Sequence, residues 1–213
     1  MKADGTTSAA AGTGHDAGNA KKPVLVILHQ ETSSPGRVGQ MLEARGHALD
    51  IRRPPMGDPL PDTLQHHAGA VMFGGPMSAN DPEDYVKRET DWLAVPLREN
   101  KPFFGICLGA QMLAAALGGE VHTSDTPELG VRRVRLNEAG MADPVWGGAV
   151  TAPAPRDIDT VQWHFDTFTL PPGATLLASS DACVNQLFRV DNCYGVQFHL
   201  EAGGDLVRGW LSH

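Results

Sequence analysis

Cys107 stands between two glycines, Gly105 and Gly109, where a short apolar run meets a helix-forming stretch. Residues 102–106 have the composition of a buried strand, and residues 111–117 are strong helix formers. A sharp strand-to-helix turn leaves little room for side chains beside the central residue, which explains glycine on both sides. Such a nucleophile elbow exposes the central thiol, so the pattern predicts that Cys107 attacks a carbonyl carbon.

The predicted helix start favours the reactive form of this cysteine. Unpaired N–H groups and the positive end of the helix dipole stabilise a thiolate, and the same N–H groups can hold an oxyanion. The alternative is that Cys107 is a small buried apolar residue, which is the commonest role of a free cysteine. The two flanking glycines favour catalysis. Cys183 and Cys193 lack such a setting, and we expect them to be structural.

A thiol nucleophile needs a base, and His199 follows an apolar strand-like run with Glu201 two residues later. Side chains two apart share one face of a strand, so this carboxylate can orient the imidazole and stabilise its cation. Alone, the pair is weak evidence. Together with the elbow it predicts a Cys107–His199–Glu201 triad.

The elements around these residues alternate between short apolar runs and helical stretches. Strand-like runs are predicted at 24–28, 47–51, 69–73 and 102–106, with helices at 38–45, 83–99 and 111–117. This order indicates an α/β fold with an open, mostly parallel central sheet and helices on both faces, whose ligands bind beyond the strand ends. The second half is predicted to be strand-rich, with runs at 131–136, 160–163, 174–178, 185–190 and 194–198.

Length and composition favour one domain. Of the 213 residues, 1–22 are rich in Ala, Gly, Thr and Ser and are predicted to form a disordered tail, while 23–213 form the domain. The tail has no apolar core typical of a secretory signal, and no later stretch has the length of a membrane span. Three unevenly spaced cysteines do not make a disulfide framework, so we expect a reduced, cytoplasmic protein.

The net charge of −8 argues against a nucleic-acid binder, which needs a basic face, and favours a small-molecule partner. No cysteine pair has metal-binding spacing and no nucleotide motif is visible, so neither a metal nor another cofactor is expected.

Three blocks of the sequence resemble the class I glutamine amidotransferases, including the glutaminase domain of GMP-synthase-type members. The blocks are Phe-Gly-Gly-Pro at 73–76, Gly-Ile-Cys-Leu-Gly-Ala-Gln at 105–111 and the His-x-Glu block at 195–201. The resemblance runs from Val24 onward and implies a flavodoxin-like fold and a stand-alone amidotransferase domain. The family commonly has proline between the His and Glu, where this chain has Leu200.

The resemblance also implies an oxyanion hole. Its donors would be the backbone N–H groups of Gly75 and Leu108, with Gly74 beside the bound substrate. Two donors aimed at a developing charge suit this chemistry, and a Gly-Gly-Pro turn brings bare backbone close to the reacting carbonyl. An ordinary tight turn at 74–76 is the alternative.

Further substrate contacts are implied at Gln111, His164 and Asp166. Gln111 lies in the first turns of the predicted helix, where it could also be a surface residue. His164 and Asp166 follow a strand-like run, and a histidine beside aromatic residues is also often a packing residue.

The function predicted on this basis is hydrolysis of the glutamine side-chain amide through an acyl-thioester on Cys107. His199 would act first as base and later as acid. The domain uses up the chain, so a separate synthetase subunit would accept the ammonia, if any does. The alternatives are hydrolysis of γ-glutamyl peptides or conjugates, and a non-catalytic regulatory or binding module.

Overall fold

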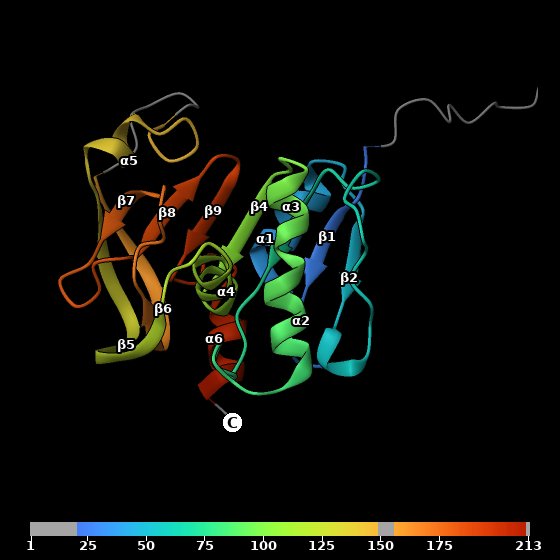
Figure 1. Cartoon of the computed structure of the whole chain (residues 1–213). Helices are drawn as coiled ribbons and strands as arrows, with labels where there is room; N and C mark the ends of the chain where they lie inside the picture. Colours follow the sequence, from blue (N-terminus) through green and yellow to red (C-terminus); the bar gives the residue numbers. More distant parts are fainter. Residues whose placement is uncertain (1–20, 149–155, 212–213) are drawn as a thin grey trace, which may run out of the picture.

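A single large sheet organises the computed structural model, which describes residues 21–148 and 156–211. Within these ranges nine strands pair in the order β2-β1-β3-β4-β9-β8-β7-β5-β6 (Figure 1). The predicted tail at 1–22 lies almost entirely outside the described residues, so its prediction remains open. In the described part of the chain, no helix is long and apolar enough to cross a bilayer.

One half of the sheet is parallel. Its strands are β2 (Leu49–Arg52), β1 (Val24–Ile27), β3 (Gly69–Met72), β4 (Phe103–Ile106) and β9 (Cys193–Val196). Every residue of β1 and β3 is buried, as expected where helices cover both faces of parallel strands. The predicted α/β fold is confirmed.

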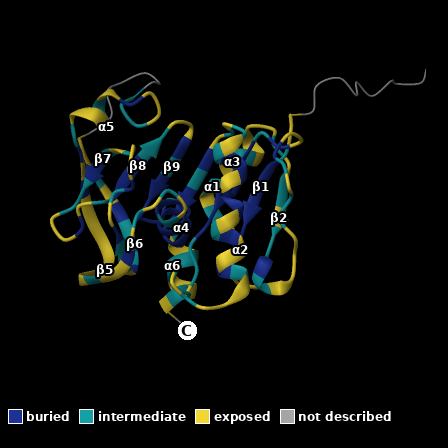
Figure 2. Cartoon of the chain, viewed as in Figure 1, coloured by how far each residue is buried: buried dark blue, intermediate teal, exposed yellow. Residues whose placement is uncertain are grey.

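Two apolar clusters fill the two faces of this half. Leu25 of β1 packs in one cluster with Val86 and Leu113, while its neighbour Val26 packs in the other, which Val38 extends. Successive strand residues therefore face opposite layers of helices. Figure 2 shows β1 in the dark blue of buried residues and yellow, exposed residues on α2. The helices are α1 (Gly36–Ala44), α2 (Asp84–Trp92), α3 (Ala94–Arg98), α4 (Leu108–Ala116), α5 (Glu138–Ala142) and α6 (Gly204–Leu211), with a short 3₁₀ helix at Pro54–Met56.

The other half of the sheet is antiparallel and comes from the second part of the chain. It contains β8 (Leu187–Val190), β7 (Thr175–Ser179), β5 (Val121–Leu136) and β6 (Asp157–Phe168). The strand-rich second half is thus present, but β5 and β6 are longer than predicted. They pair with each other along most of their length, with a register shift between Thr123 and Glu128. This pairing stabilises the extended conformation of polar stretches that were not predicted as strands.

Two helices differ from the prediction in their limits. The helix expected over 83–99 is divided into α2 and α3. Pro96 lies in the first turn of α3, where a backbone N–H would have no carbonyl partner within the helix, so proline is tolerated there. Helix α4 begins at Leu108, three residues before the predicted start, because Cys107 already occupies the N-cap position. The turn that carries the cysteine is therefore tighter than the sequence pattern indicates.

Candidate active site

Cys107 lies at the turn between β4 and α4 in a conformation that few non-glycine residues adopt. Its φ is 52° and its ψ is −105°. The flanking glycines are sterically required: a Cβ at Gly105 would lie 2.5 Å from the carbonyl oxygen of Gly109, and a Cβ at Gly109 would collide with the carbonyl oxygen of Met72. The strand-to-helix turn expected from the sequence is present, with the strain that such elbows hold.

His199 and Glu201 follow β9, which lies next to β4 in the sheet. The His199 Nδ1 atom and the Glu201 Oε1 atom are 2.7 Å apart, and both residues are buried. The His199 backbone N–H donates to the carbonyl of Val161 in β6, which fixes the main chain beneath the ring. A carboxylate at this distance from Nδ1 holds the imidazole ring in one orientation and leaves the other ring nitrogen, Nε2, available for proton transfer.

Cys107 and His199 meet beside Gly74. A Cβ added to Gly74 would lie 3.0 Å from His199 Cε1 and 3.4 Å from Cys107 Cβ. Burial acts to lower the pKa of His199, but the charge and hydrogen-bonding capacity of the Cys107 sulfur, together with the Glu201 carboxylate, outweigh burial and raise this pKa. The protonated form of His199 is therefore favoured beside the Cys107 sulfur.

Gln197 is a residue of this site that the sequence reasoning missed. Its Nε2 atom donates to Cys107 Sγ at 3.6 Å, and its Oε1 atom accepts from Gln111 Nε2 at 3.3 Å. A signal was available in the sequence, because residues 197, 199 and 201 are spaced two apart, as residues on one face of a strand are. An N–H directed at sulfur stabilises the thiolate form.

The residues expected to form the oxyanion hole lie at the same place. Leu108 is the first residue of α4, and the first N–H groups of a helix have no partner within it. Gly74 borders the cysteine and histidine, and Gly75 follows on the same loop after β3.

These groups open into a cavity of about 550 Å³. Helix α6 forms one side of it: the Trp210 ring lies 4.9 Å from the His199 ring and 5.9 Å from that of Trp163, both in edge-to-face contacts. The cavity contains the whole predicted triad. It is lined by Leu28, Gln30, Thr32, Ser33, Ser34, Phe73, Gly74, Gly75, Pro76, Cys107, Trp163, His199, Glu201, Asp205, Leu206, Gly209 and Trp210.

Comparison with known families agrees with this geometry. The sequence profile of the family described as "Glutamine amidotransferase class-I" matches residues 31–206, which is most of the chain. The chain belongs to this family.

Several members of the family are similar over long stretches. A "Putative glutamine amidotransferase-like protein YfeJ" from Salmonella typhimurium is 29% identical over 199 residues, covering 89% of this chain and 80% of that protein. A glutamine-hydrolyzing GMP synthase subunit from Sulfurisphaera tokodaii is 34% identical over 143 residues, covering 66% of this chain and 70% of that protein. A glutamine amido transferase crystal structure from Methylobacillus flagellatus superposes with a TM-score of 0.82 at 33% identity, covering 90% of this chain and 75% of that one.

The other predicted substrate contacts form hydrogen bonds within the protein. His164 is buried, with Nε2 3.3 Å from a Glu128 oxygen and Nδ1 3.0 Å from the Asp166 carbonyl oxygen. The Asp166 carboxylate accepts from the Ser78 hydroxyl at 2.6 Å. Gln111 donates to the Asp166 carbonyl at 3.0 Å. The three do not line the cavity, and their part in substrate binding stays a prediction.

The described part of the chain contains a second buried group with metal-ligand chemistry, formed by Glu128, His164 and Cys183, whose ligand atoms all lie within 4.8 Å of one another. Its polar atoms already have hydrogen-bond partners: Glu128 accepts from Ser180 at 3.0 Å and from Gln186 at 2.6 Å, and the Cys183 sulfur lies 3.4 Å from the Thr167 hydroxyl. Burial raises the pKa of the Cys183 thiol, which disfavours the thiolate that a metal requires. We interpret the group as a hydrogen-bonded network that supports the strand carrying Trp163.

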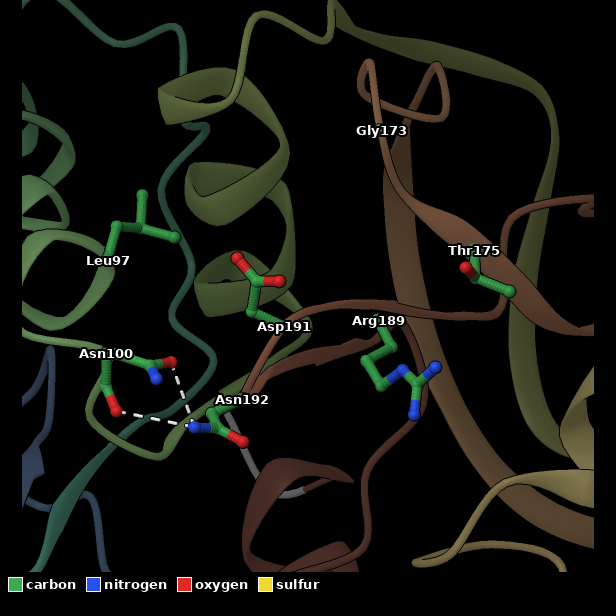
Figure 3. Close-up of a pocket in the computed structure, with 7 residues that line it drawn as sticks. All are labelled: Leu97, Asn100, Gly173, Thr175, Arg189, Asp191 and Asn192. Carbon is green, nitrogen blue, oxygen red and sulfur yellow. Dashed lines mark hydrogen bonds between the residues drawn. The ribbon is translucent and has the colours of Figure 1, made fainter.

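A second cavity, of about 620 Å³, lies near the start of β4 and the β8–β9 turn (Figure 3). The Asn192 side chain donates to Asn100 Oδ1 at 2.9 Å, and Arg189, on the other side, pairs with Asp143 at 3.1 Å. It is at the opposite ends of the strands from Cys107. Its lining does not include Cys107, His199 or Glu201.

Proposed function

We propose that this chain hydrolyses the side-chain amide of glutamine, with Cys107 as nucleophile, His199 as acid and base, and Glu201 as the orienting carboxylate. The observation that carries the proposal is the buried His199–Glu201 contact of 2.7 Å next to a strained cysteine at a helix N-terminus. Family membership alone would leave the non-catalytic alternative open, since folds are kept without activity. The filled triad favours the enzyme.

In the first half-reaction the Cys107 sulfur bonds to the amide carbon, and the carbonyl electron pair moves to oxygen. The N–H groups of Gly75 and Leu108 are the proposed donors to this oxyanion. The imidazolium of His199 then gives its proton to the amide nitrogen, the C–N bond breaks, and ammonia leaves an acyl-thioester on the sulfur.

In the second half-reaction water attacks the thioester while neutral His199 takes one of its protons. The C–S bond breaks, glutamate leaves, and the sulfur returns to thiolate opposite the imidazolium. Gln197 favours this last step, because its N–H toward the sulfur stabilises the leaving thiolate. One water is consumed, and glutamate and ammonia are formed.

We also propose that a separate synthetase subunit takes up the ammonia. The relative from Sulfurisphaera tokodaii is named as one subunit of a GMP synthase. The match to the GMP synthase of Aeropyrum pernix, at 32% identity, covers 73% of this chain but 29% of that protein.

The apolar wall of the cavity favours one second candidate. Trp163, Leu206 and Trp210 line the cavity together with the triad. Such a wall suits a γ-glutamyl compound whose amide nitrogen carries an apolar substituent, and the chemistry at Cys107 would be unchanged.

The deciding experiment measures ammonia and glutamate released by the purified chain from glutamine, and amine and glutamate released from a γ-glutamyl dipeptide. Cys107→Ser is the blank. Release from glutamine supports the first proposal, and stimulation by an added synthetase supports the subunit role. Release from the dipeptide alone supports the second candidate. Silence on both substrates, with Cys107 inert to iodoacetamide, would establish the non-catalytic module.

A further inference from the structure

His29 and Glu89 form a buried pair behind the loop that follows β3. The His29 Nε2 atom is 2.7 Å from Glu89 Oε2, and both side chains are fully buried. The second ring nitrogen, Nδ1, is 3.1 Å from the carbonyl oxygen of Gly74. One imidazole thus connects α2, which carries Glu89, to the proposed oxyanion loop.

The chemistry of these three groups fixes where one proton lies. A carbonyl oxygen only accepts, so Nδ1 of His29 must carry the hydrogen that it donates to Gly74. Nε2 and the Glu89 carboxyl share a further proton, and whichever of them holds it, the bond from Nδ1 to Gly74 persists. The Gly74 carbonyl is therefore held toward His29 in either state.

The direction of that carbonyl sets the direction of the next N–H. No peptide bond in the described part of the chain is cis, and in a trans peptide the C=O and the following N–H point in opposite directions. His29 packs against Gly75, where an added Cβ would lie 2.8 Å from His29 Cβ, while Gly74 faces Cys107 and His199. A carbonyl held toward His29 leaves the Gly75 N–H directed away from it.

A pair of glycines does not hold such a peptide by itself, because glycine has access to more backbone conformations than any other residue. The buried pair is also poorly satisfied as a purely structural contact. Glu89 Oε1 has no hydrogen-bond partner among the described residues, and a buried unpartnered carboxylate oxygen is unfavourable.

We propose that His29 and Glu89 are positioning residues, which hold the Gly74–Gly75 peptide so that the Gly75 N–H is ready for the oxyanion. The inference rests on the proposed hydrolysis at Cys107. A donor that is already in place stabilises the transition state without reorganisation, and its loss affects turnover rather than substrate binding.

Two substitutions of His29 separate this role from a structural one. The amide of His29→Asn reaches the position of Nδ1 and can donate to Gly74, but it abandons Glu89. The amide of His29→Gln reaches the position of Nε2 and keeps Glu89, but it leaves Gly74 without a donor. His29→Gln should lower kcat for glutamine by about 10-fold to 100-fold with KM little changed. His29→Asn should keep most of kcat while losing more thermal stability.

His67→Gln is the matched control, because His67 is buried and bonds the Asp50 carboxylate at 2.9 Å away from the cavity. It should leave kcat unchanged. Alkylation of Cys107 by iodoacetamide forms no oxyanion, so its rate should be the same in wild type and His29→Gln. Glu89→Gln, whose amide can still donate to Nε2, should retain more turnover than Glu89→Leu.

If the variants lose kcat in proportion to their loss of thermal stability, so that His29→Asn loses most, the inference is overturned while the proposed function stays intact. A wild type without turnover would instead overturn the proposed function. If the wild type has no turnover, crystal structures of the two His29 variants still test whether His29 positions the Gly74–Gly75 peptide. A rotated Gly74–Gly75 peptide in His29→Gln alone supports it, and an unchanged peptide in both variants refutes it.

Discussion

The backbone at Cys107 stores energy that a structural cysteine would have no reason to hold. A non-glycine residue in such a region costs on the order of 1–3 kcal/mol, and the surrounding structure must maintain it. Here Gly105 and Gly109 make the turn sterically possible, and Gln197 and His199 act on the sulfur. The strained backbone of Cys107 and the polar partners of its sulfur distinguish it from Cys193, whose thiol pKa is raised by burial to about 11.

Glu201→Gln tests the electrostatic part of this arrangement. The Glu201 carboxylate raises the pKa of His199, so its removal lowers that pKa, and the imidazolium loses its proton at a lower pH. We expect the alkaline limb of the kcat/KM profile for glutamine to move to lower pH, with a smaller loss of kcat than in Cys107→Ser or His199→Ala. A pH-rate series measures both. A loss as large as that of Cys107→Ser with an unmoved limb would contradict an orienting role.

Gly74→Ala tests how closely the proposed nucleophile, Cys107, and the proposed base, His199, must approach each other. The added Cβ would lie 3.0 Å from His199 Cε1 and 3.4 Å from Cys107 Cβ, which forces the imidazole away from the sulfur. Small misplacements at reacting groups lower the rate by about 100-fold, and we expect a loss of this order in kcat. Gly203→Ala is the control, since its new Cβ would only make an ordinary contact 3.8 Å from Arg37 Cδ. Equal activity in both variants would show that the approach at Gly74 is not tight.

At the scale of elements, the sequence predicts features that are set by neighbouring residues, but it does not predict contacts between residues far apart in the chain. The elbow around Cys107 and the alternation at His199 and Glu201 are set within a few residues, so the sequence predicts them. The contact between His29 and Glu89 joins residues 60 positions apart, and it depends on how α2 packs on the sheet. Nothing in the local sequence around either residue signals it.

Helix α6 is another element whose place the sequence did not indicate. Its Trp210 lies against His199 and Trp163, and so closes one side of the cavity. Trp210→Ala should remove that wall and raise KM for glutamine by about 2-fold to 10-fold, since an aromatic contact contributes about 0.5–1.5 kcal/mol. It should also speed alkylation of Cys107 by a bulky maleimide. Steady-state kinetics and labelling rates measure the two effects, with Trp210→Phe as the conservative control. Unchanged KM and labelling would mean that α6 does not enclose the substrate.

At the scale of the whole molecule, β9 joins the two halves of the sheet and leads directly to His199, the proposed base. It pairs with β4 in parallel and with β8 in antiparallel orientation, so Cys107 and His199 follow adjacent strands. The sequence predicted the parallel part from continuous apolar runs. It underestimated the lengths of β5 and β6, because many of their residues are polar and the two strands are stabilised by pairing with each other.

Gly195→Ala tests this junction. Gly195 lies in the middle of β9 and faces the fully buried ring of Phe188 in β8, whose Cζ atom would be 2.7 Å from an added Cβ. Overpacking of this kind costs about 1–3 kcal/mol, and each kcal/mol shifts Tm by about 2–4 °C in a domain of this size, so we expect Tm to fall by about 2–12 °C. Phe188→Leu provides room, and the double variant should be more stable than the sum of the two single losses predicts. Thermal and urea unfolding of the four proteins measure the coupling. Strict additivity would show that the ring moves aside at little cost, and that the junction is held by its backbone hydrogen bonds rather than by this contact.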